Sequence, residues 1–141
     1  MKHILMIATG GTIASKETGE GLAPAISSDE LLACVPEVAQ VCSVYTVQPF
    51  NLDSTNVHAP HWLEIASIVE KNYSRYDGFV VTHGTDTMAY TAAALSYLIQ
   101  NNAKPVVLTG SQKSVYSRDT DARRNLSDAF LFCADDNAYG V

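Results

Sequence analysis

Residues 4–12 read ILMIATGGT, an uninterrupted apolar run that leads directly into glycine and threonine. The same order returns in FVVTHGTDT at residues 79–87 and in VVLTGSQ at residues 106–112. A short continuous apolar run is typical of a strand buried in a parallel sheet, and ligands bind beyond the carboxyl ends of such strands. We therefore expect these three glycine- and hydroxyl-bearing ends to form one pocket for a small polar molecule.

The composition suits a globular domain that handles small molecules. The chain has 141 residues, of which 47% are hydrophobic, and a formal net charge of −6. Its basic residues are scattered apart from Arg123-Arg124, so no nucleic-acid surface is expected. No apolar run approaches the length of a membrane span, so no membrane partner is expected either. The cysteines are three widely spaced residues without metal-ligand spacing, which indicates reduced thiols in a cytoplasmic protein.

Strand and helix patterns alternate along the chain. Strands are expected at residues 4–8, 38–50, 78–82 and 105–109, and helices between Ser27 and Pro36 and at 58–74, 88–100 and 120–134. Residues 12–26 show no helical period and are expected to form a mobile lid over the strand ends. The alternation predicts an α/β fold with a mostly parallel sheet flanked by helices and joined by right-handed crossovers. Residues 139–141 resemble the start of another strand, so we expect the N-terminal part of a longer protein.

Thr12 is a candidate nucleophile because it lies just past the first strand. A threonine hydroxyl attacks a carbonyl only when a base or a hydrogen-bond network takes its proton. The alternative is a turn hydroxyl that bonds to local backbone. Gly10 and Gly11 allow close approach to a ligand or merely a tight turn. A dinucleotide fingerprint would need spaced glycines that open directly into a helix, and this loop lacks them.

Two further segments combine hydroxyls with acids. Thr85, Asp86 and Thr87 precede a helix, so Thr87 or Asp86 could simply cap it. Alternatively, the segment forms a site where the carboxylate holds a substrate ammonium and free backbone N–H groups hold an anion. Ser54, with its neighbours Asp53 and Thr55, allows the same two interpretations. A metal site at His58 and His61 is disfavoured because no further ligand joins them.

Taken together, these motifs resemble the bacterial-type L-asparaginase family. The matching segments are TGGTIA at residues 9–14, DST at 53–55, THGTDTMAY at 82–90 and TGSQ at 109–112. They occur in order across nearly the whole chain, and the first and third are highly specific. The sequence around Tyr90, Thr91 and Leu95 is most similar to the cytoplasmic type I branch.

The resemblance implies a flavodoxin- or Rossmann-like N-terminal catalytic domain over residues 1–141, without the smaller C-terminal domain. It implies hydrolysis of L-asparagine, with L-glutamine as a second candidate substrate, without cofactor or metal, by a homodimer or homotetramer when full length. The implied catalytic residues are Thr12 as nucleophile, Thr85 and Asp86, the last also binding the α-ammonium. The implied substrate contacts are Gly11, Ser54, Thr55, Gly84 and Ser111, with Ser54 at the α-carboxylate, Ser111 at the amide end, and oxyanion donors near Gly11 and Thr85.

Two departures from the family pattern bear on mechanism. Family members often carry a lid tyrosine, whereas no tyrosine occurs between Thr12 and Tyr45, and Leu22 stands in the lid. The family's catalytic lysine lies beyond Val141, and Lys113 is a remote substitute. We therefore expect this chain alone to be inactive.

Two other functions remain open. One is an asparaginase-like subunit of a tRNA-dependent amidotransferase, although those proteins carry an extra domain before a motif that begins here at residue 9. The other is an inactive amino-acid-binding fragment, which would bind L-aspartate without turnover.

Overall fold

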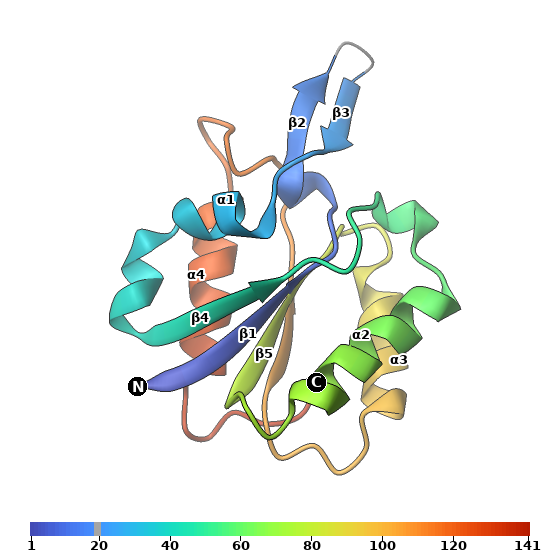
Figure 1. The fold of residues 1–141 in the computed structure, drawn as a ribbon. Helices are drawn as coiled ribbons and strands as arrows, with labels where there is room; N and C mark the ends of the chain where they lie inside the picture. Colours follow the sequence, from blue (N-terminus) through green and yellow to red (C-terminus); the bar gives the residue numbers. More distant parts are fainter. Residues whose placement is uncertain (19–20) are drawn as a thin grey trace.

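The computed structural model describes residues 1–18 and 21–141. Its centre is a parallel sheet of four strands in the order β4-β1-β5-β6, and a separate antiparallel hairpin, β2-β3, stands beyond the strand ends (Figure 1). The strands are β1 Lys2–Ala8, β2 Ser15–Thr18, β3 Gly21–Pro24, β4 Cys42–Val47, β5 Gly78–Thr82 and β6 Val106–Thr109. The helices are α1 Ser28–Ala33, α2 Ala59–Asn72, α3 Met88–Leu98 and α4 Ala122–Cys133, with short 3-10 turns at Thr12–Ala14, Pro36–Gln40 and Ser54–Asn56. The predicted α/β class with a flanked parallel sheet is confirmed.

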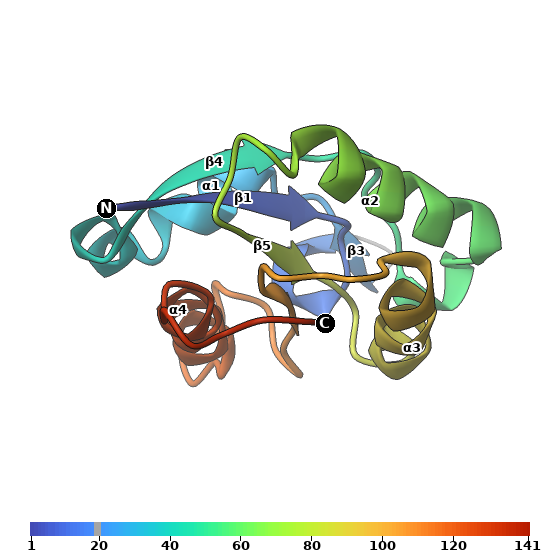
Figure 2. The same cartoon turned by 90° about the horizontal axis from the view of Figure 1, so that it is seen from below.

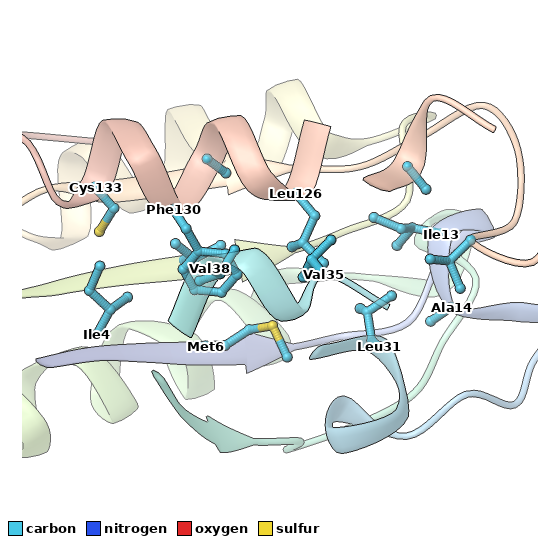
Figure 3. Packing of buried hydrophobic residues seen from close by; sticks show 14 of the residues in the cluster. Ile4, Met6, Ile13, Ala14, Leu31, Val35, Val38, Leu126, Phe130 and Cys133 are labelled. Atoms are coloured by element: carbon cyan, nitrogen blue, oxygen red, sulfur yellow. The ribbon is translucent and has the colours of Figure 1, made fainter. Parts of the chain in front are cut away.

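Helices cover both faces of the sheet, with α4 on one side and α2 and α3 on the other (Figure 2). Alternate side chains of the strands are buried against these two layers. Ile4, Met6 and Val80 pack with Phe130 of α4 in one apolar cluster, which Figure 3 displays from close by. Leu5, Ile7, Phe79 and Val81 pack with Ile65 and Val69 of α2 and Leu95 of α3 in the other. Both faces of each central strand are therefore apolar, which explains the continuous apolar runs in the sequence.

The connections between parallel strands through α1, α2 and α3 are right-handed, whereas the connection through α4 is left-handed. The connections through α1, α2 and α3 follow the right-handed rule for parallel strands. The chain then leaves β6, descends through α4 on the face opposite α3, and pairs at Gly140 with Pro105 on the outer side of β6. This step continues in the direction of the α3 step but on the other face, so it is left-handed. The expectation of right-handed crossovers was wrong for this step. Asn125 donates to Gly110 O and Asp121 accepts from Gln112 N–H, which ties the loop after β6 to α4 on that face.

The predicted elements are otherwise present, with shifted bounds. The capping box of Ser27 and Glu30 opens α1 as expected. The strand predicted at 38–50 is shorter, because its register with β1, its neighbour in the described sheet, covers only Cys42–Val47. The segment expected to be a lid without helical period forms a 3-10 turn and the β2-β3 hairpin, whose link at residues 19 and 20 lies outside the described residues. None of the described helices is long and apolar enough to span a bilayer.

Candidate active site

The loops after β1 and β5 meet at the point where the sheet topology reverses. From β1 the chain moves outward to β4 on one side, and it later returns to β5 on the other side of β1. Crevices at such switch points are where open α/β sheets bind ligands. The loop after β4, which carries Leu52, joins them. Leu52 N–H donates to Thr9 O and Gly11 N–H donates to Leu52 O, both at 2.9 Å.

Glycine backbones from two of these loops lie directly against each other. Gly11 has φ 79° and ψ −178°, a combination that is essentially restricted to glycine. A Cβ at Gly11 would lie under 3.0 Å from Gly84, and a Cβ at Gly84 would lie equally close to the Ser54 side chain. Thr87 Oγ1 adds a bond of 2.7 Å to Ser54 O. The three loops therefore lie in close contact because Gly11 and Gly84 have no side chains, and hydrogen bonds hold them there.

A small polar cavity lies where these loops meet. Its volume is about 100 Å³, enough for a few water molecules or a group of similar size. Its lining consists of Gly11, Thr12, Ser15, Pro24, Asp53, Ser54, Gly84, Thr85 and Asp86. The structure thus brings together six of the eight residues singled out from the sequence, namely Gly11, Thr12, Ser54, Gly84, Thr85 and Asp86. Their chemical roles remain predictions.

Two of the predicted substrate contacts lie outside this lining. Ser111 is buried, and its hydroxyl donates to Lys113 O at 2.5 Å, so it stabilises the loop after β6 instead of facing the cavity. Thr55 donates its hydroxyl to Asp53 Oδ1 at 2.8 Å. Lys113 pairs with Asp119 and does not reach the cavity either. Gly11 N–H, expected near the oxyanion, is already bound to Leu52 O.

The charges that line the cavity are negative. Asp53 and Asp86 contribute two carboxylates, and none of the described lining residues is a lysine or arginine. The backbone N–H of Thr55 lowers the pKa of Asp53, with a further contribution from the Thr55 hydroxyl, so Asp53 is ionised at neutral pH. Two carboxylates beside hydroxyl groups suit an ammonium group and a neutral polar group on one small molecule.

Gln112 and Ser15 reach the site without having been singled out from the sequence. Gln112 Nε2 donates to Thr85 Oγ1 at 3.3 Å, which leaves the proton of the Thr85 hydroxyl available to another acceptor. Ser15 lines the cavity and bonds to Gly11 O at 2.9 Å. The TGSQ segment was a signal for Gln112, but no pattern indicated Ser15, because the hairpin that positions it was not predicted.

Larger hollows occur elsewhere on the protein. A groove of about 580 Å³ between α2 and α3 is lined by apolar groups such as Leu63 and Leu98. Its lining also holds Ser67, Glu70 and Tyr73, but it contains none of the residues that the sequence analysis singled out as site residues. Among the described residues, no three His, Cys, Asp or Glu side chains are grouped as metal ligands, and His58 and His61 bond through backbone and ring instead.

The comparison with known proteins agrees with this architecture. The family model described as "Asparaginase, N-terminal" matches residues 3–141. The chain belongs to the asparaginase family. An L-asparaginase of Thermococcus kodakarensis is 42% identical over 134 residues, which are 92% of this chain and 40% of that protein.

Two further similar proteins are an amidotransferase component and another asparaginase of known structure. A component of the glutamyl-tRNA(Gln) amidotransferase of Pyrococcus abyssi is 45% identical over 130 residues, 89% of this chain and 30% of that protein. The structure of a probable cytoplasmic L-asparaginase from Campylobacter jejuni superposes with a TM-score of 0.86 at 33% identity, covering 98% of this chain and 41% of that one. The chain therefore spans less than half the length of these asparaginase-family relatives.

Proposed function

We propose that this chain is the N-terminal α/β catalytic domain of an amidohydrolase that converts L-asparagine to L-aspartate and ammonia. The observation that carries the proposal is the small cavity that gathers Thr12, Thr85 and Asp86 from two strand ends. The size of that cavity favours a small amino acid. Glutamine is the longer alternative, and one extra methylene is worth only about 1–3 kcal/mol of discrimination.

In the proposed reaction Thr12 Oγ attacks the side-chain carbonyl carbon of asparagine. The carbonyl oxygen becomes an oxyanion that backbone N–H groups stabilise, and the amide nitrogen takes up a proton and leaves as ammonia. Water then hydrolyses the Thr12 ester, which releases aspartate and restores the hydroxyl. Thr85 and Asp86 form the second hydroxyl–acid group.

The rest of the substrate is held by charge and hydrogen bonding. Asp86 binds the α-ammonium, and the negative lining supports this assignment. Ser54 receives the α-carboxylate, beside Thr55. The described lining offers no lysine or arginine to help Thr12 lose its proton. We therefore propose that the 141-residue chain alone is inactive, and that the complete protein is a cytoplasmic homodimer or homotetramer in which further chain completes the site.

The test is ammonia release from L-asparagine and L-glutamine by the complete protein and by the 141-residue chain. Thr12→Ala abolishes release, Thr12→Ser restores part of it, and Thr46→Ala, which alters a hydroxyl bonded to Asp29 away from the cavity, serves as the control. Substantial hydrolysis by Thr12→Ala would remove Thr12 from the nucleophile role.

A second function is favoured by the 45% identity to the amidotransferase component of Pyrococcus abyssi. In that case the same cavity would release ammonia for a partner protein. Turnover that requires a partner protein, or that prefers glutamine, would identify this function. Binding of L-aspartate by the complete protein without any turnover would instead indicate an inactive binding domain.

A further inference from the structure

His83 is fully buried beneath the candidate site and is not used by the proposed mechanism. It lies between the end of β5 and Gly84 and makes two hydrogen bonds through its ring. Nδ1 is 2.8 Å from Gly84 O, and Nε2 is 2.8 Å from Thr91 Oγ1 on α3. The Thr91 hydroxyl also accepts a bond of 3.0 Å from Trp62 Nε1 on α2.

The partners of the ring determine which nitrogen carries the proton. A backbone carbonyl can only accept, so Nδ1 must donate its hydrogen to Gly84 O. In the neutral ring Nε2 is then an acceptor, and the Thr91 hydroxyl donates to it while accepting from Trp62. The ring is neutral because burial lowers its pKa below the ordinary value. The series of hydrogen bonds therefore has one consistent direction: Trp62 donates to Thr91, Thr91 donates to His83, and His83 donates to Gly84 O.

The bond to Gly84 O also fixes the next N–H group. In a trans peptide the carbonyl and the following N–H point in opposite directions within one plane, and the described chain contains no cis bond. The Gly84 carbonyl points down to the buried imidazole, so Thr85 N–H points away from it, on the side where Gly84 and Thr85 line the cavity. Among the described residues, Thr85 N–H has no hydrogen-bond acceptor.

We propose that His83 is a positioning residue that holds the Gly84–Thr85 peptide with Thr85 N–H directed into the cavity as an oxyanion donor. This inference rests on the proposed amidohydrolase function. Gly11 N–H, the other expected donor, is bound to Leu52 O, which makes the Thr85 group more important. The hydrogen bonds through Thr91 and Trp62 tie this donor to α3 and α2, so the two helices set its direction.

The tautomer can be measured without substrate. Long-range proton–nitrogen NMR spectra of the 141-residue chain near neutral pH show a protonated Nδ1 and an unprotonated Nε2 for His83, with the exposed His3 as an internal reference. A ring protonated on Nε2 alone, or on both nitrogens, would overturn the proposal. This measurement is independent of whether asparagine is the substrate.

Two substitutions of His83 distinguish a role in orienting the Gly84–Thr85 peptide from a role in filling the core. The amide nitrogen of Asn can occupy the place of Nδ1, whereas that of Gln occupies the place of Nε2. His83→Gln therefore loses the bond to Gly84 O. It lowers kcat of the complete protein about 10- to 100-fold with little change in KM, because the Thr85 donor is misdirected but still present, and complete removal of such a donor costs about 10²–10³. His83→Asn recovers most of that kcat, although it unfolds at a lower temperature because it leaves a cavity.

If His83 acts through the Gly84–Thr85 peptide, His83→Asn has the higher kcat of the two variants although it unfolds at a lower temperature. If kcat follows thermal stability instead, so that His83→Asn is the slower variant, the residue is a packing group and the proposal is wrong. If the complete wild-type protein releases no ammonia, the proposed function fails. The NMR measurement then still decides the orientation of the ring and of the peptide.

Discussion

Replacing Gly11 by alanine tests the close contact between the two strand-end loops. An alanine at φ 79° and ψ −178° occupies a region that costs about 1–3 kcal/mol. Its Cβ would also lie under 3.0 Å from the Gly84 backbone, and forcing extra atoms into a packed site costs about another 1–3 kcal/mol. We expect Gly11→Ala to lower the free energy of unfolding by about 2–6 kcal/mol.

Gly140 offers a matched control. It also has a positive φ, 83°, but a Cβ there would meet nothing within 4 Å. Gly140→Ala should therefore lose only the backbone contribution, about 1–2 kcal/mol. The extra destabilisation of Gly11→Ala over Gly140→Ala reports mainly the close contact with the backbone of His83 and Gly84.

Urea unfolding of the 141-residue chain provides the assay. The sequence has one tryptophan, Trp62, which lies in the network below the site and reports on it by fluorescence. If Gly11→Ala is destabilised no more than Gly140→Ala, within about 0.5 kcal/mol, the two loops do not touch as described and the reasoning is refuted.

Two further predictions concern charge. Asp86→Asn should weaken L-aspartate binding by the complete protein about 10- to 100-fold, since a bond to a charged group contributes about 1.5–3 kcal/mol; Asp128→Asn on the outside of α4 is the control, and calorimetry showing equal affinities would remove Asp86 from the site. Burial lowers the pKa of His83, so just below about pH 6.5 the unfolded chain binds more protons than the folded chain. The contribution of the buried neutral ring to stability is therefore complete above that pH. It is lost as the pH falls, by at most about 1.4 kcal/mol per pH unit. Urea titrations from about pH 7 to about pH 5 should show this slope in the wild type and a smaller one in His83→Asn, and equal slopes would contradict it.

The sheet could be predicted because its central strands are buried on both faces. Residues 4–8, 79–81 and 106–108 are continuously apolar for that reason, and the strand ends carry the polar groups that the sequence analysis singled out. Parallel strands share one edge for their carboxyl ends, so most of the cavity lining followed from local sequence alone.

Features set by distant contacts could not be predicted. Ser15 lines the site because its carbonyl bonds to Ser114 and its hydroxyl to Gly11 O. In the left-handed step through α4, Asn125 and Asp121 bond the loop after β6 from residues 9 to 15 positions away along the chain. Neither contact leaves a periodic pattern in the sequence. The bond from the Ser111 hydroxyl to Lys113 O in its own loop is likewise not visible in the local sequence.

The root of the β2-β3 hairpin bears on how a ligand could reach the site. Ala14 O accepts N–H bonds of 2.9 Å from both Ala25 and Ile26, and Val115 N–H donates to Ile13 O. A hinge would have to break several such bonds, each contributing about 1 kcal/mol. The lining residues Ser15 and Pro24, which pair with each other, are therefore anchored to the loop that carries Thr12. Substitutions at the described strand positions farther from the root, such as Glu17, should therefore leave the position of Thr12 unchanged, because the bonds that anchor the root do not involve them.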